Sequence, residues 1–350
     1  MKLGMMLSYA GGFTAAATEA AELEKAGLDV LWVPEAYSFD AVSQLGYLAA
    51  VTERVQLGSA ILPLYSRTPA LIAMSAAGLD FVSDGRFILG LGASGPQVVE
   101  GFHGVPYDRP VARTREIVDI CRRVWRREVL INDGIYQLPL PPGQGTGLGK
   151  ALKLINHPVR PEIPIYLASL GEANVELTAE VADGWLPMLY LPERAKHVWG
   201  RSLAAGAARR DPFRAPLEVA TGGMVAFVDD PGRARSLLDL ARPMAALYIG
   251  GMGARGRNFY NALACRYGFS PEAARVQELY LAGDRSGAAE AVPDALIEGT
   301  NLVGPPAYVG ERLAAFAESG VTILNVVPMA SERGKRLRLV EQLRAMVDDL

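Results

Sequence analysis

Short apolar runs alternate with longer amphipathic segments along most of the chain. Eight runs have the length of β-strands: 2–7, 29–34, 55–62, 86–92, 163–169, 185–190, 217–228 and 321–328. Most of them lack polar alternation, which is typical of parallel strands that are covered on both faces. The segments between them have the length and apolar spacing of helices, so the pattern predicts repeated βα units.

Two segments interrupt this regular spacing. Residues 129–162 are rich in Gly and Pro and indicate an excursion between the fourth helix and the fifth strand, whereas residues 250–303 indicate a mainly helical insertion before the last βα unit. We therefore predict a single α/β domain over residues 1–350, a (β/α)8 TIM barrel with these two insertions. On the catalytic side such insertions would shape or cover the barrel mouth. A doubly wound open sheet is the alternative.

Composition and charge exclude several classes of protein. The 350 residues are 50% hydrophobic and 21% charged, with a formal net charge of −3. No basic tract suits a nucleic acid backbone, because the arginines of 121–128 alternate with apolar residues at helical spacing. No segment reaches the roughly 20 apolar residues of a membrane span, and the amino terminus lacks a signal-peptide pattern. We expect a cytoplasmic protein that binds neither nucleic acid nor membrane.

Cysteine and histidine spacing does not predict a metal site. Cys121 and Cys265 do not form a C-x-x-C pair, and His103, His157 and His197 are far apart in sequence. We therefore expect no metal.

The stretch LGLGASGPQVVEGFHG (89–104) contains a formal G-x-G-x-x-G match. A dinucleotide fingerprint should follow the first strand of its unit, with an acidic residue about 20 positions later at the end of a second strand. Here three βα units come first, and Glu116 lies within a predicted helix. The glycines instead allow the backbone at the end of the fourth strand to approach a ligand closely.

Several stretches together resemble one protein family. They are KLGMMLSYAG, WVPEAYSFDA, residues 57–104, VARTREIVDICRRVW, GTGLGKALKLINHP, PIYLASLGEANVELTAEVADGWLP and ALYIGGMGARGRNFY. The chain resembles the luciferase-like (bacterial luciferase superfamily) oxidoreductases over nearly its full length, particularly the branch that uses the deazaflavin coenzyme F420. The resemblance implies a TIM barrel whose mouth holds the cofactor ring at the carboxyl ends of the strands.

The resemblance also implies which residues contact the cofactor. Relatives carry a non-prolyl cis peptide in a bulge of the third strand, which matches Ser59–Ala60, and Leu62 follows at a cofactor-contacting position. The other implied contacts are Glu35, Ser94, Gly95, Pro96, Gln97, Val99, Ser169, Leu170, Gly171, Glu172, Asn174, Val175, Gly184 and Trp185. A phosphate suits the free N–H groups of the helix that begins near Gly171, although Glu172 is an unusual neighbour for an anion.

A reductase that receives a hydride from F420 also needs a proton donor. Several relatives have an acidic residue followed by His after the second strand, whereas this chain has Glu35-Ala36-Tyr37. The catalytic candidates are Glu35, Tyr37 and His103, and the alternative for Glu35 is a contact to the cofactor ring.

Aromatic residues fall at or just beyond predicted strand ends. We expect Tyr9, Phe39, Tyr65, Phe102 and Tyr190, together with Tyr37, to line a pocket for a planar or unsaturated substrate, although such residues also pack cores.

Three functions remain open. The first is F420-dependent hydride transfer to or from a small organic molecule, most simply reduction of a C=C or C=N bond. The second is an FMN-dependent monooxygenase of the same superfamily, and the third is a catalytically silent flavin-binding relative. Arg67 and the arginines of GARGR (253–257) would suit the oligoglutamyl tail of F420. From the resemblance we also expect a homodimer.

Overall fold

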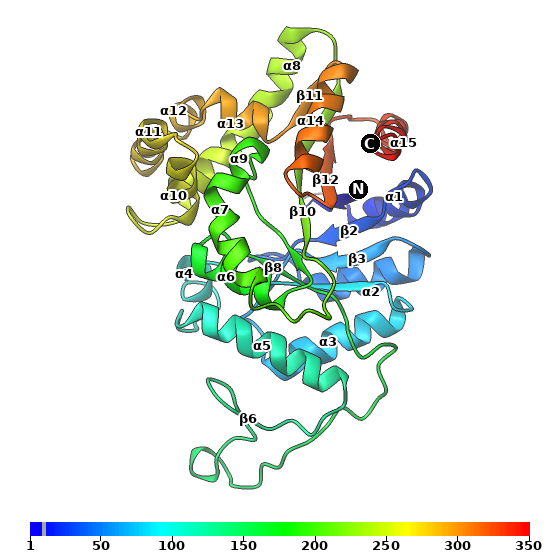
Figure 1. Ribbon diagram of the computed structural model, residues 1–350, viewed down its shortest axis with the longest axis vertical. Helices are drawn as coiled ribbons and strands as arrows, with labels where there is room; N and C mark the ends of the chain where they lie inside the picture. Colours follow the sequence, from blue (N-terminus) through cyan, green and yellow to red (C-terminus); the bar gives the residue numbers. More distant parts are fainter. Residues whose placement is uncertain (9–11) are drawn as a thin grey trace.

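The computed structural model describes residues 1–8 and 12–350 (Figure 1). Within these residues a closed ring of eight parallel strands forms the centre of the molecule. In ring order they are β1 (Lys2–Met6), β2 (Val30–Val33), β3 (Gln56–Ser59), β5 (Phe87–Gly92), β8 (Ile165–Ala168), β9 (Gly184–Trp185), β10 (Glu218–Phe227) and β12 (Ile323–Pro328). Pairing of β12 with β1 closes the ring. The TIM barrel is confirmed, and the open-sheet alternative is wrong.

Two short strands extend the ring. β4 (Leu62–Pro63) pairs with the end of β5, and β11 (Leu302–Gly304) pairs with the end of β10. The strand predicted over 185–190 is shorter than expected, because only Gly184–Trp185 is in the ladder. Pro187 has no N–H to donate, and Leu189 has a left-handed φ of 51°, so the chain turns away there.

Helices surround the ring. They are α1 (Phe13–Lys25), α2 (Ala41–Val51), α3 (Pro69–Val82), α4 (Pro96–Val99), α5 (Pro110–Trp125), α6 (Glu172–Val181), α7 (Pro192–Ala207), α14 (Pro306–Glu318) and α15 (Arg333–Asp348). Local sequence fixes several of their starts. Asp40 accepts a hydrogen bond from the Ser43 N–H at the start of α2, and Thr68 caps α3, which has Pro69 as its first residue. None of the helices in the described part of the chain is both long and apolar enough to cross a membrane.

The predicted helical insertion over 250–303 is part of a longer helical segment, which follows the carboxyl end of β10. Its elements are α8 (Pro231–Leu238), η2 (Asp239–Ala241), α9 (Arg242–Ala246), η3 (Leu247–Gly251), α10 (Phe259–Arg266), α11 (Ser270–Leu281), α12 (Arg285–Glu290) and α13 (Asp294–Gly299). Because strand carboxyl ends form the barrel mouth, this insertion lies on the side where TIM barrels bind ligands.

Residues 129–162 extend away from the barrel as an arm (Figure 1). The arm contains a small hairpin, β6 (Asn132–Asp133) with β7 (Gln137–Leu138), and the turn η1 (Pro142–Gln144). It connects the end of α5 to the beginning of β8, which places it at the amino-terminal side of the barrel. The arm therefore lies away from the mouth.

The barrel interior is filled by large side chains that lie against glycines. Trp32 and Tyr166 pack with ring centroids 5.5 Å apart within an inner apolar cluster. A Cβ on Gly58 would lie 2.2 Å from the Trp32 ring, and one on Gly184 would lie 2.4 Å from the Tyr166 ring. Only glycine fits at these two positions, so the interior is a packed floor and not a channel.

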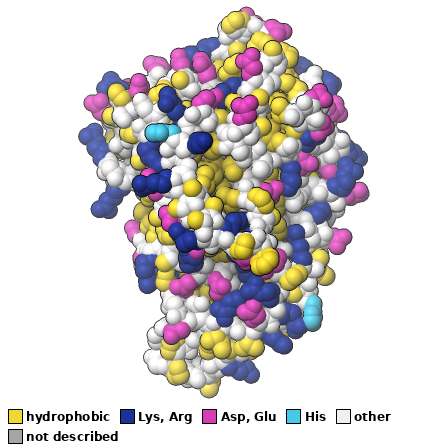
Figure 2. All heavy atoms as spheres, viewed as in Figure 1, with side chains coloured by type: hydrophobic (Ala, Val, Ile, Leu, Met, Phe, Trp, Pro, Cys, Tyr) yellow, Lys and Arg dark blue, Asp and Glu magenta, His cyan; other side chains and the backbone are white. Residues whose placement is uncertain are grey.

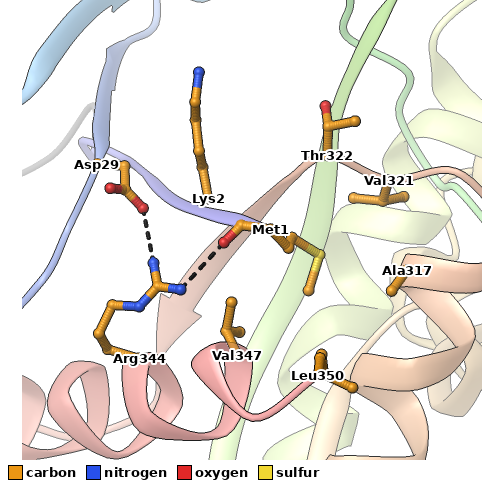
Figure 3. A pocket seen from close by; sticks show the side chains of 9 residues that line it. All are labelled: Met1, Lys2, Asp29, Ala317, Val321, Thr322, Arg344, Val347 and Leu350. Atoms are coloured by element: carbon orange, nitrogen blue, oxygen red, sulfur yellow. Dashed lines mark hydrogen bonds and ion pairs between the residues drawn. The ribbon is translucent and has the colours of Figure 1, made fainter.

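A cavity of about 540 Å³ lies at the opposite end from the mouth (Figure 3). Arg344 crosses its edge and donates to Asp29 and to the carbonyl of Met1. Met1 and Asp29 immediately precede β1 and β2, at the end of the barrel that contributes to stability and not to catalysis.

Acidic and basic side chains are interspersed on the face shown in Figure 2, around a band of hydrophobic side chains.

Candidate active site

The floor of the mouth is apolar with one amide. Ala60, Ile61 and Ala168 pack onto the inner cluster, and the Trp32 indole donates to Oδ1 of Asn325 at 2.8 Å. A Cβ on Gly92 would lie 3.0 Å from the Ile61 side chain, so a glycine at this position lets Ile61 pack closely against β5. A flat apolar floor with one fixed polar group suits a planar ring.

The predicted cis peptide is displaced by one residue. The cis bond joins Ala60 to Ile61, not Ser59 to Ala60. The Ala60 N–H still donates to the Val33 carbonyl, so the regular ladder continues through Ala60. The Ser59 hydroxyl donates to the carbonyl of Gly90 and accepts from its N–H, both at 2.9 Å. Ser59 is therefore occupied in joining β3 to β5 and is not free to bind a cofactor.

Several predicted cofactor contacts are buried between the strands and the outer helices. They are Leu62, Val99, Val175 and Trp185. The Trp185 indole donates to the carbonyl of Ser169, and Gly184 is covered by Tyr166. These residues support the mouth from behind, because their side chains belong to the core.

The segment after β5 lies at the rim. Ser94 is exposed with a left-handed φ of 57°, and Gly95 precedes the single turn of α4. Pro96 and Gln97 are also exposed. This segment remains accessible to a ligand over the floor.

The beginning of α6 suits an anion. Its N-cap, Gly171, offers no side chain to the free N–H groups. The buried Oδ1 of Asn174 has no hydrogen-bond partner in the part of the chain that the structure describes, but because it is an acceptor it does not contribute to anion binding. Glu172 pairs with Arg266 at 3.2 Å and with Arg201 at 3.8 Å. Two guanidinium groups therefore compensate the charge of this acidic residue.

Other groups near α6 are engaged within the protein. The Ser169 hydroxyl bonds to that of Thr178 at 2.8 Å, and the Leu170 carbonyl accepts from the Trp199 indole at 3.1 Å. These bonds fix the loop that leads into the helix.

Glu35 forms a bidentate pair with Arg67. The Oε1–Nη1 distance is 2.5 Å and the Oε2–Nη2 distance is 2.9 Å, and Oε2 also accepts the Ala41 N–H at 2.7 Å. Both side chains are almost completely buried. Both carboxyl oxygens act as acceptors, so this geometry suits an ionised, fixed carboxylate better than a proton donor.

Aromatic side chains stand at the rim. Tyr37 and Phe102 are each 66% exposed, and their ring centroids are 6.2 Å apart. His103 packs edge-on against Phe102, and its buried Nε2 has no hydrogen-bond partner among residues 1–8 and 12–350. Phe39 is also exposed. The rings of Tyr37, Phe102 and His103 thus lie together at this rim.

Two expected pocket residues are buried elsewhere. Tyr65 donates to the Asp108 carbonyl at 2.8 Å, and Tyr190 stacks on Trp199 and donates to the Ser319 carbonyl. Both side chains belong to the core, because each phenol donates a hydrogen bond to a backbone carbonyl away from the mouth. Tyr9 lies outside the described residues.

Sequence reasoning missed Ile61 and Asn325, which lie at the floor. Asn325 had a signal, because it is the only polar residue inside the apolar run 323–328. No His, Cys, Asp or Glu cluster among the described residues could hold a metal ion.

Comparisons with known proteins agree with this architecture. The family profile of the luciferase-like monooxygenases matches residues 1–322. A putative coenzyme F420-dependent oxidoreductase of Mycobacterium tuberculosis is 41% identical over 344 residues, covering 96% of this chain and 98% of that protein. The 5,10-methylenetetrahydromethanopterin reductase of Archaeoglobus fulgidus is 27% identical, covering 91% and 90%.

Among solved structures, the coenzyme F420-dependent tetrahydromethanopterin reductase of Methanopyrus kandleri superposes with a TM-score of 0.78 at 20% identity, covering 97% of each chain. The profile match and the full-length relative at 41% identity agree with the observed barrel. The chain therefore belongs to the luciferase-like monooxygenase family.

Proposed function

We propose that this protein is a coenzyme F420-dependent oxidoreductase that transfers a hydride between the deazaflavin C5 and a C=C or C=N bond of a small organic molecule. The observation that carries the proposal is a pair of exposed arginines in the loop just before Phe259, which lies beside the N-cap of α6. Arg255 and Arg257 are exposed and form no salt bridge within the described residues. Arg257 is two positions before Phe259, whose ring lies 3.5 Å from a Cβ placed on Gly171.

The residues present fit this cofactor. The floor around Ile61 and Ala168 would lie under the ring, and the N–H groups that follow Gly171 would hold the phosphate. Arg255 and Arg257 would meet the oligoglutamyl tail. When bound, the deazaflavin supplies or accepts the hydride at C5.

His103 is the proton donor that this geometry favours. Its free Nε2 lies beside the exposed aromatic pair, whereas the oxygens of Glu35 are occupied by Arg67 and the Ala41 N–H. Tyr37 remains a second donor, because its exposed phenol lies at the same rim. In this assignment Glu35 positions the rim through Arg67.

An FMN-dependent monooxygenase is the second candidate, because a helix N-terminus would also hold the phosphate of FMN. FMN has no anionic tail beyond its phosphate, so it gives Arg255 and Arg257 no role. A silent relative would need neither these arginines nor a free His103 nitrogen.

The test compares F420 with the same deazaflavin chromophore that lacks the phosphate and the glutamates. Substitution of Arg255 and Arg257 by Gln should weaken F420 binding about tenfold at low salt, because exposed ion pairs contribute only a modest binding free energy that salt screens. The affinity for the tail-less chromophore should not change. Equal F420 affinity in the variant would contradict the tail assignment. Arg194→Gln and Arg338→Gln, which remove two charges elsewhere, form the matched control.

We also propose a homodimer through α2 and α3. α2 contains no charged residue, and α3 contains only the buried Asp80. Leu71, Met74 and Phe81 nevertheless lie exposed along α3, and Tyr47 is exposed on the neighbouring α2. Such an apolar helix face suits a second copy, because the same patch on two chains is self-complementary.

A further inference from the structure

The inward face of β12 carries one amide, that of Asn325. Ile323 belongs to the inner apolar cluster, and side chains of a strand alternate, so Asn325 also points into the barrel, one layer nearer the mouth. Its register partners on the two neighbouring strands are Gly4 and Gly222. A Cβ on Gly4 would overlap Oδ1 of Asn325, so a glycine on β1 gives the amide its space.

The Trp32 indole fixes the orientation of this amide. Its N–H donates to Asn325 at 2.8 Å, and only the carbonyl oxygen Oδ1 can accept that bond. Trp32 is completely buried, so the bond lies inside the protein. The Nδ2 group of Asn325 has no hydrogen-bond partner within residues 1–8 and 12–350, although the residue is partly exposed. The floor therefore offers a ligand an N–H donor at this position.

Apolar side chains surround the amide on the side of the mouth. Met6 and Val327 lie two positions beyond Gly4 and Asn325, so they share the same inward faces. They are 41% and 47% exposed, which shows that the space above the floor is open. In apolar surroundings a hydrogen bond is stronger than in water, and a donor left without a partner is costly. The amide therefore favours a ligand that brings an acceptor to this point.

The proposed reaction requires an acceptor of this kind when it reduces a C=C bond. An isolated C=C bond has no atom that readily takes up the electron pair, whereas a C=C bond conjugated with a carbonyl passes the pair to oxygen. A C–H bond then forms at the β-carbon, the π pair moves to give an enolate, and the proton donor assigned above completes the α-carbon. The hydride, with both electrons, comes from reduced F420, the reductant of the proposed function. An N–H aimed at the oxygen gains strength as negative charge develops there.

We propose that Asn325, oriented by Trp32, is a substrate-binding residue whose Nδ2 group donates to the oxygen of a carbonyl conjugated with the reducible C=C bond. This inference rests on the proposed function and narrows its substrate class to α,β-unsaturated carbonyl compounds. Asn325 contacts the reacting system, and Trp32 is a positioning residue that acts through it.

The test uses carvone and limonene, which share a carbon skeleton and differ in the conjugated carbonyl oxygen. Calorimetric titration of the full chain, with and without oxidised F420, measures both affinities. Asn325→Leu should weaken carvone binding about three- to tenfold, because a hydrogen bond to the carbonyl is lost. The same variant should bind limonene within twofold of the unchanged protein.

Asn325→Asp distinguishes a donor to the ligand from an amide with a structural role alone. The carboxyl group has the size of the amide and still accepts from Trp32, but when it is ionised it has no donor for the ligand. Carvone affinity should therefore fall at high pH and recover as the pH falls through the pKa of the new carboxyl group, whereas Asn325→Leu should show no recovery. Asn156→Asp adds the same charge in the exposed arm and is the matched control, which should bind carvone like the unchanged protein at every pH.

Turnover of carvone with reduced F420 gives a second measurement. Removal of a donor that faces a developing oxyanion lowers kcat by about a hundredfold or more. Asn325→Leu should therefore lose more in kcat than in carvone affinity, and the product of the unchanged protein should be dihydrocarvone.

Absence of carvone binding, or equal carvone affinity in Asn325→Leu and the unchanged protein, would overturn the inference. So would an Asn325→Asp variant without pH dependence, or formation of carveol in place of dihydrocarvone. Failure of the proposed function gives a different result, because F420 would then fail to bind while the dependence of carvone affinity on Asn325 persisted.

Discussion

The buried pair of Glu35 and Arg67 gives a quantitative test of how the mouth is held together. Their side chains are 7% and 13% exposed, so Glu35→Gln leaves a guanidinium inside the protein without its bidentate partner. Removing one member of a buried pair costs about 3–5 kcal/mol. Arg67 lies close enough to Asp40 to help lower the pKa of that carboxyl group. Asp40 therefore partly compensates the charge of Arg67 in the variant, and we expect the free energy of unfolding to fall by about 3 kcal/mol.

Urea unfolding followed by tryptophan fluorescence and circular dichroism measures this loss. Glu278→Gln is the matched control, because Glu278 and Arg275 form an exposed pair at 3.0 Å whose removal should cost less than about 0.5 kcal/mol. The double variant Glu35→Gln, Arg67→Met should recover part of the stability by removing the stranded charge. A loss for Glu35→Gln as small as that of the control would refute the view that this pair holds the rim.

Three further predictions concern assembly, packing and pH. Phe81→Asp should convert the dimer to a monomer in light scattering after size-exclusion chromatography, whereas the exposed Phe213→Asp should not; a dimer that survives Phe81→Asp would exclude the α3 face. Gly58→Ala should lower the free energy of unfolding, measured in urea, by about 1–3 kcal/mol because the new Cβ would lie 2.2 Å from Trp32. The control Gly200→Ala in α7 should raise it by about 0.5–1 kcal/mol. An unchanged stability of Gly58→Ala would contradict the packed floor. Hydrogen bonds from Arg235 and Arg242 lower the pKa of Asp294 to about 2 from an ordinary 3.8, so its stabilising contribution is present above about pH 4 and is lost as the pH falls toward 2. The stability difference between the unchanged protein and Asp294→Asn should therefore shrink over that interval, and a constant difference would rule out the pairing.

The barrel was predictable from sequence because its strands are continuous apolar runs with helix-length segments between them. The cap residues Asp40 and Thr68 and the prolines at helix starts agreed locally with that pattern. What sequence alone did not show was the direction of individual side chains. Tyr65 and Tyr190 follow strand ends as Tyr37 does, but their phenols bond backbone carbonyls in the core.

The site was predictable in outline for a similar reason. The resemblance located the broken third strand within one residue, and the true break follows Ala60 because its N–H still belongs to the ladder. The π-helical turn η3 was not predicted, because its contacts with Asn258 and Tyr280 follow from no local pattern.

The most direct test of the central claim is a fluorescence titration of the apo protein with F420 and, separately, with FMN at moderate salt. The exposed arginines of residues 253–257 and the apolar floor predict tight, selective binding of F420. Preferential binding of FMN, or binding of neither, would contradict the account.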